Sequence, residues 1–174
     1  MLTHVSQATV YAAVDELVGI LGIKEEIAHW PLVDLARRKK TAECAQQVAV
    51  ELGLPVRIDL SYVSDSPSSG TGSRFQSSDL VETGRPAESS GSIVAQVSVP
   101  DGLPLYGSAD LMGYPISVRL GKHCHKTPKT LVAVLAHEMS HVLLYALRHP
   151  KASSDLHVDL VPLILGVCRR TGLS

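Results

Sequence analysis

Apolar residues recur with helical spacing in the first third of the chain. One apolar stripe runs through residues 6–22, and a second runs through residues 31–52, where Pro31 suits a first helical turn. Gly22 and Gly53 follow these stripes, as glycine often does at the C-terminal end of a helix. The pattern predicts a helix over residues 6–22 and one continuous helix over residues 31–52.

The middle of the chain alternates apolar and polar residues in the manner of strands. Strands are predicted over residues 55–63, 93–99 and 116–120. Residues 64–91 are instead rich in Ser, Gly, Pro and Thr, a composition that buries too little apolar surface to order itself. We interpret 64–91 as a mobile loop within one domain, and as an unselected insertion in preference to a lid, a self-cleavage site or a tether.

Two more helices are predicted towards the C-terminus. From about Pro128 to Leu147 nearly every position is apolar, so this helix is expected to be central and buried, with Thr127 as its candidate N-cap. A last helix is predicted from Asp155 to about Arg169. The elements together predict an α+β fold, in which a small twisted sheet of about three to four strands packs on helices.

Composition restricts the class of protein and its partners. A chain of 174 residues suits one domain, 1–174, and its 45% hydrophobic content can build a core that is mainly aliphatic, since aromatics are only 4%. The net charge of -1 gives no indication of nucleic acid or an acidic membrane surface as a partner. The basic cluster at residues 37–40 is expected to be a solvated face of the second predicted helix.

The chain carries no sign of export or membrane insertion. No apolar run reaches the length of a bilayer span, and the first residues lack the basic and apolar regions of a signal peptide. The cysteines Cys44, Cys124 and Cys168 are odd in number and scattered, which fits a reducing compartment. These features predict a cytoplasmic protein.

The motif His-Glu-x-x-His at residues 137–141 carries the clearest chemistry. His137 and His141 are four positions apart, so on a helix both can reach one metal ion, and Glu138 can reach a water on that metal. Burying three such side chains in an apolar helix is costly unless they are bonded or bind metal. The motif is the signature of zinc peptidases and predicts one Zn²⁺ ion, with Glu138 as general base.

A catalytic zinc usually has three protein ligands and one open position. The last predicted helix opens with Asp155, His157 and Asp159, all of which are competent zinc ligands. Asp155 and Asp159 lie on one helical face, whereas His157 points elsewhere if the helix has already begun. These residue types alone leave the third ligand open among the three.

The motif and the acidic helix after it resemble the gluzincin metallopeptidases, of which thermolysin is a familiar member. Residues 93–166 are also similar to small bacterial domains of the IrrE-like kind, with a strand, a glycine-containing loop, a second strand, the apolar motif helix and then E-x-x-T/S-D. The resemblance covers less than half of the chain. It implies a zincin-like fold.

The resemblance also implies roles for individual residues. His137 and His141 would be ligands, Glu138 the general base, Asp155 the third ligand, and Asp159 the carboxylate that orients a ligating histidine. The family has glutamate where this chain has Asp155, one methylene shorter. Either the helix that carries Asp155 lies closer to the motif helix, or a water molecule bridges Asp155 and the metal, or another residue is the third ligand.

Zinc hydrolases also stabilise the developing oxyanion. Four residues are candidate donors for this role: Tyr106, Tyr114, Tyr145 and His149. Tyr106 and Tyr114 flank the loop before the third predicted strand, and Tyr145 follows His141 by one helical turn. For each tyrosine, packing in the core is the commoner role.

The function predicted from these features is a zinc-dependent metallopeptidase in which Glu138 activates a zinc-bound water. Its partner would be a protein or peptide substrate, lying as an extended strand along an exposed sheet edge near the motif helix. The resemblance implies action on one specific intracellular protein. The alternative is a regulatory or interaction module that keeps zinc without turnover.

Overall fold

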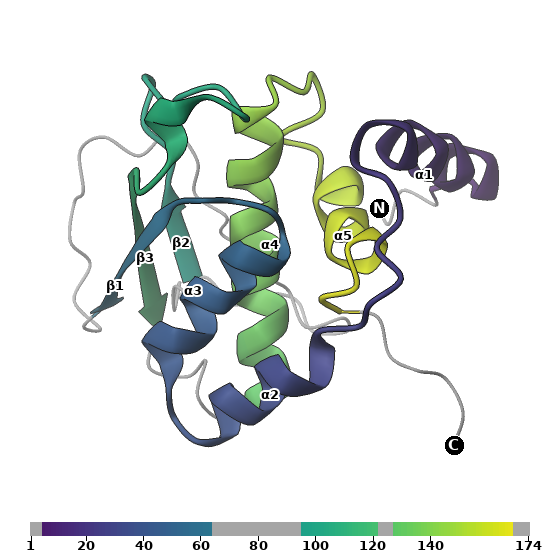
Figure 1. Cartoon of the computed structure of the whole chain (residues 1–174). Helices are drawn as coiled ribbons and strands as arrows, with labels where there is room; N and C mark the ends of the chain where they lie inside the picture. Colours follow the sequence, from purple (N-terminus) through teal and green to yellow (C-terminus); the bar gives the residue numbers. More distant parts are fainter. Residues whose placement is uncertain (1–4, 64–94, 122–126, 169–174) are drawn as a thin grey trace, which may run out of the picture.

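The computed structural model describes residues 5–63, 95–121 and 127–168. The predicted loop at 64–91 lies outside the described residues. The described residues fold into five α-helices and three strands, with a short 3₁₀ turn η1 (Ala109–Leu111) before the last strand (Figure 1). This arrangement confirms the predicted α+β class.

The first helix, α1 (Gln7–Leu21), agrees with its prediction within a residue at each end. The second predicted helix is wrong: residues 31–52 form α2 (His29–Arg37) and α3 (Thr41–Glu51). The amides of Lys39 and Lys40 turn back to the carbonyls of Ala36 and Leu35, and Lys39 adopts a left-handed φ of 59°. This is the usual helix-ending motif, but with lysine where glycine is the common signal.

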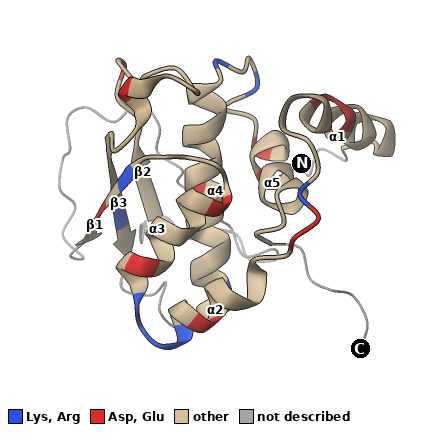
Figure 2. Cartoon of the chain, in the orientation of Figure 1, with Lys and Arg blue, Asp and Glu red and all other residues tan. Residues whose placement is uncertain are grey.

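The break changes the setting of the basic cluster. Residues 37–40 form the exposed turn between α2 and α3, visible as a blue segment in Figure 2, and not the face of one long helix as predicted. Arg38 pairs with Asp34 and Lys40 with Glu43 at 3.0 and 3.6 Å. The basic cluster is therefore solvated, and acidic residues of α2 and α3 neutralise part of its positive charge.

The sheet is formed by β1 (Arg57–Val63), β2 (Ala95–Ser98) and β3 (Pro115–Gly121), in the order β1-β3-β2. β1 pairs with β3 in parallel, from Arg57 opposite Pro115 to Val63 opposite Gly121, and β2 pairs with β3 antiparallel. Buried and exposed residues alternate along β3, as its period of two predicts. β2 is therefore an outer strand among the described strands, and it lies beside the motif helix (Figure 1).

The motif helix α4 (Pro128–Ala146) is the centre of the molecule. It packs against α2, α3 and β2, and against the last helix, α5 (Asp155–Ile164). Most of its residues are buried, because apolar side chains surround it on nearly every side, as predicted. The helix therefore places its polar motif inside the protein.

The last helix is shorter than predicted. α5 ends at Ile164 instead of about Arg169, and Gly166 follows with a φ of 79° while the amide of Val167 bonds to the carbonyl of Pro162. Gly166 thus supplies the left-handed residue that ends the helix. None of the described helices combines the length and the apolar character needed to cross a membrane.

Candidate metal centre

The two histidines of the motif lie side by side on the face of α4 that meets α5. The rings of His137 and His141 are 5.0 Å apart between centroids and nearly perpendicular. Each residue is 6% exposed, although both come from a helix that is otherwise largely apolar. Their spacing of one helical turn produces this juxtaposition.

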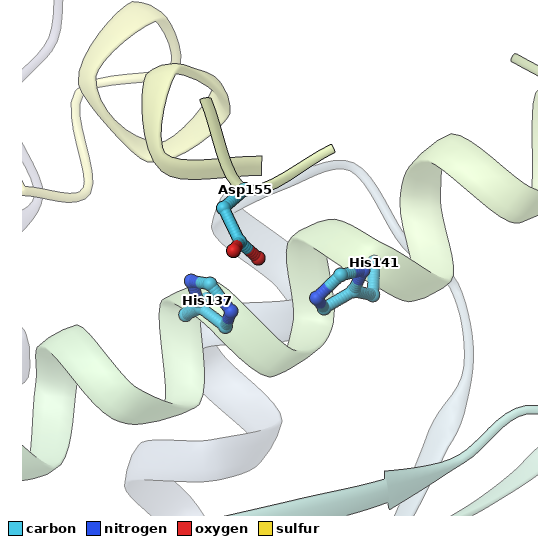
Figure 3. Close-up of side chains that lie close together, drawn as sticks. All are labelled: His137, His141 and Asp155. Carbon is cyan, nitrogen blue, oxygen red and sulfur yellow. The ribbon is translucent and has the colours of Figure 1, made fainter. Parts of the chain in front are cut away.

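Asp155 completes the cluster from the first turn of α5. Ligand atoms of His137, His141 and Asp155 all lie within 4.8 Å of one another. Figure 3 shows the carboxylate of Asp155 directed towards the two imidazole rings. Asp155 is itself exposed, so this side of the cluster is open to solvent.

The hydrogen bonds of the two imidazoles determine which nitrogens remain for a metal. Nδ1 of His137 lies 2.8 Å from Oδ1 of Asp159, and Nδ1 of His141 lies 2.9 Å from the carbonyl oxygen of Ala152. A carbonyl and a carboxylate accept hydrogen bonds, so each Nδ1 donates and each Nε2 keeps a lone pair. This is the arrangement by which proteins orient histidines that bind metals.

The surroundings of the two histidines shift their pKa values in opposite directions. Burial favours the neutral form of His137, but the hydrogen bond and charge of Asp159, with the charges of Glu138 and Asp155, outweigh burial and raise the pKa of His137 above 6.5. Burial, together with the neighbouring His137, lowers the pKa of His141 below 6.5. His137 therefore has a higher affinity for a proton than His141.

Glu138 lies next to this cluster and is only 1% exposed. Its Oε2 accepts a hydrogen bond of 3.1 Å from the backbone amide of Val97 in β2. The glutamate therefore spans from α4 to the outer strand of the sheet. A buried carboxylate with a backbone donor on one oxygen is held in one orientation.

The three proposed third ligands have different surroundings. Asp155 belongs to the cluster, and Asp159 hydrogen-bonds to His137. His157 turns away: its Nδ1 lies 3.0 Å from Oγ of Ser154, and its Nε2 lies 3.3 Å from Oε2 of Glu16. These placements favour Asp155 as the ligand and Asp159 as the residue that orients His137.

The candidate oxyanion donors are spread over the molecule. Tyr106 lines a cavity of about 430 Å³ between α1 and α3, together with Ile20 and Val50, and does not belong to the histidine cluster. Tyr114 packs against the core at the start of β3. Neither placement supports a role at the cluster.

Tyr145 and His149 lie nearer to the residues that support the site. Tyr145 hydrogen-bonds to Ser153, which follows the Ala152 carbonyl that orients His141. Nε2 of His149 lies 2.9 Å from Oε1 of Glu16. Tyr145 is therefore the candidate donor with the closest tie to the site.

Several supporting groups have no local signal in the sequence. The carbonyl of Ala152 and the amide of Val97 are backbone groups: every residue type supplies a carbonyl, and every type except proline supplies an amide N–H. Glu16 lies far from the motif in sequence, and tertiary packing brings it to His157, on the helix that carries Asp155. A search for ligand-type side chains near the motif therefore cannot find them.

Two nitrogens and one carboxylate oxygen are a donor set that suits Zn²⁺. The fit rests on geometry: both imidazoles are oriented through Nδ1, and a ring nitrogen of each lies within 4.8 Å of a carboxylate oxygen of Asp155. The residues present therefore fit the metal. No family model, curated protein or solved structure matches this chain.

Proposed function

We propose that the protein is a zinc-dependent metallopeptidase. The observation that supports this function most directly is the convergence of His137, His141 and Asp155, with the buried Glu138 on the adjoining face of α4. Three ligands of this kind leave one position of a tetrahedral zinc for water or substrate. A structural site would instead close all four positions.

Each residue has a distinct role in this proposal. His137, His141 and Asp155 would hold the ion, while Asp159 and the Ala152 carbonyl keep the imidazoles oriented. When bound, zinc would polarise a peptide carbonyl and lower the pKa of a water molecule. The Asp155 side chain, although shorter than glutamate, reaches the histidines because α5 packs directly against α4.

Glu138 is the proton carrier of the proposed reaction. Its carboxylate would take a proton from water and pass it to the amine that leaves when the peptide bond breaks. The hydrogen bond from Val97 limits the freedom of Glu138, so that proton transfer starts from one geometry. An extended peptide lying beside β2 would bring its carbonyl groups near both Glu138 and the histidine cluster.

The metal is tested by measuring zinc content by elemental mass spectrometry on purified wild type and on Asp155→Ala, Asp159→Ala and His157→Ala. We expect one equivalent in the wild type and the greatest loss with Asp155→Ala. Loss of the carboxylate that orients His137 should weaken binding about 10- to 100-fold in Asp159→Ala. Asp110→Ala, an exposed aspartate in η1, is the matched control.

Hydrolysis is tested with a library of peptides from a digested proteome, in which new termini are identified by mass spectrometry. Glu138→Gln keeps the size of the side chain but removes the base, so cleavage should fall about 10²- to 10⁴-fold while zinc stays bound. Cleavage that persists in Glu138→Gln would contradict the role of Glu138. Zinc binding without any cleavage would favour the alternative of an interaction module.

A further inference from the structure

Glu16 connects α1 to two buried histidines outside the cluster. Its Oε2 lies 3.3 Å from Nε2 of His157, and its Oε1 lies 2.9 Å from Nε2 of His149. The two imidazole side chains are only 9% and 4% exposed, whereas that of Glu16 is 43% exposed. One carboxylate on the surface thus faces two imidazoles that belong to the interior.

The hydrogen-bond partners of these rings show that the carboxylate is an anchor and not a second metal site. Nδ1 of His149 accepts a hydrogen bond of 3.0 Å from the backbone amide of Lys151, so the proton of the neutral ring is on Nε2. This Nε2 lies 2.9 Å from the Glu16 carboxylate without the alignment of a hydrogen bond, so its contact with Glu16 is one of proximity and charge. Nε2 of His157 also faces a carboxylate oxygen, which has no proton to donate. A metal would need lone pairs at these positions, where the rings carry hydrogens instead.

The pKa of Glu16 agrees with its role as an anchor for the two histidines. The hydrogen bond from His157 lowers the pKa of Glu16 below 4.5, against the opposing effect of burial, and the proximity of both imidazoles adds to the lowering. The negative form of Glu16 is therefore the one that these contacts favour.

The two histidines hold the ends of the segment that completes the metal centre. His149 follows α4 closely, and His157 is in the first turn of α5. Between them the chain supplies the Ala152 carbonyl that orients His141, and then Asp155. His157 is also flanked on α5 by Asp155 and Asp159, which serve the two motif histidines.

The contacts of α1 suggest why this anchor matters. Among the described elements, α1 packs extensively only on α5, and only Ala13 and Leu17 of this helix are buried. Figure 1 shows α1 on the outer side of α5, away from the sheet. Polar contacts through Glu16 therefore supplement a small apolar interface.

We propose that Glu16 is a positioning residue for the metal centre: by binding His149 and His157, it fixes the segment between α4 and α5 so that Asp155 and the Ala152 carbonyl meet the motif histidines. This inference rests on the proposed zinc function. It assigns the N-terminal helix, which contributes no ligand, a role in setting the affinity for the ion.

The test uses Glu16→Gln, which keeps the side-chain length. Its amide offers one oxygen as an acceptor and turns an N–H group towards the other imidazole N–H, so one of the two contacts is lost. We expect zinc affinity, measured by competition with a chelator well below the melting temperature, to fall about 10-fold, the lower end of the range for groups that orient ligands. Asp15→Asn, one position earlier and exposed, removes the same charge and should bind as the wild type does.

Cobalt supplies a readout that simple destabilisation would not change. With Co²⁺ at saturation, the visible absorption bands report the coordination geometry, and Glu16→Gln should shift them relative to the wild type and Asp15→Asn. Glu16→Asp keeps the charge on a shorter arm and should give an intermediate zinc affinity, and it serves as the second variant if Glu16→Gln does not fold.

The outcomes separate the two proposals. Zinc affinity and cobalt spectra of Glu16→Gln that equal those of Asp15→Asn would overturn the positioning role, even if the variant melts earlier. A wild type that binds no zinc would reject the proposed function itself, and the positioning role with it.

Discussion

Each motif imidazole uses its two ring nitrogens for different purposes. Nδ1 donates to an acceptor of the protein, Asp159 for His137 and the Ala152 carbonyl for His141, and Nε2 remains for the proposed metal. Because the acceptor of His137 is a carboxylate and that of His141 a neutral carbonyl, the two rings differ in their affinity for a proton. Chemically identical residues thus acquire different properties from their surroundings.

A prediction at this scale concerns Gly53, which ends α3. It has a φ of 75°, and a Cβ atom there would lie 3.0 Å from Oη of Tyr106. Gly53→Ala should therefore lower the free energy of unfolding by about 1–2 kcal/mol, the cost of a left-handed conformation for an L-residue. Chemical denaturation followed by circular dichroism measures the change.

Gly19 provides the contrasting variant. It lies within α1, and a Cβ atom there would meet nothing within 4 Å. Gly19→Ala should raise the free energy of unfolding by about 0.5–1 kcal/mol, because alanine loses less conformational freedom in a helix. Equal effects of the two substitutions would contradict the conformational argument.

At the scale of elements, helices and strands with a continuous local pattern were predicted well. α1, α4 and the alternation in β1 and β3 follow directly from apolar spacing. The break between α2 and α3 was missed because Lys39 takes the position where glycine normally marks the end of a helix. The early end of α5 was also missed, although Gly166 is a glycine of the kind that marks the end of a helix.

In the candidate site, too, some contacts follow from local sequence and others depend on packing between elements. The proximity of His137 to His141 follows from one turn of helix, so the sequence alone predicts it. The approach of Asp155 depends on how α5 packs against α4, and the anchor at Glu16 depends on how α1 packs against α5. Such contacts between elements have no local pattern, which is why the residue types left Asp155, Asp159 and His157 open as the third ligand.

A prediction at the element scale concerns the ion pair of Lys24 with Glu51, which ties the segment after α1 to the end of α3. Burial raises the pKa of Glu51, but Lys24 and Gln47 outweigh it, so the pKa is lowered below 4.5. A lowered pKa stabilises the folded state above the pKa of the unfolded chain, and this stabilisation disappears as the pH falls through the folded value.

Glu51→Gln should therefore cost roughly 0.5 kcal/mol of unfolding free energy at pH 7. The difference from the wild type should shrink as the pH falls below 4.5. Urea denaturation over a pH series tests this, with the exposed Glu25→Gln as control. A difference that grows towards acid pH would contradict the sign.

At the scale of the whole molecule, the proposed metal ligands connect the central helix α4 to α5. α4 contacts three other helices and β2. A ligand that binds only the folded arrangement stabilises the entire domain, not one helix. The stability of the protein should therefore depend on metal.

This dependence is measurable by thermal melting. Free zinc at about 100 times its dissociation constant should add about 2.7 kcal/mol to the free energy of unfolding. For a chain of this size that corresponds to roughly 5–10 °C in Tm. Glu138→Gln should keep the shift and His141→Ala should lose it; a shift that persists in His141→Ala would place the ion elsewhere.

The position of Asp155 after α4 also has a consequence for biosynthesis. A ribosome makes the motif histidines before the helix that carries Asp155, so a nascent chain that has reached only α4 holds two of the three proposed ligands. The parallel pairing of β1 with β3 also joins strands that are distant in the sequence, and such non-local pairing slows the folding of the protein. An enzyme built in this order would become active only once α5 has docked, so unfinished chains would not cleave their surroundings.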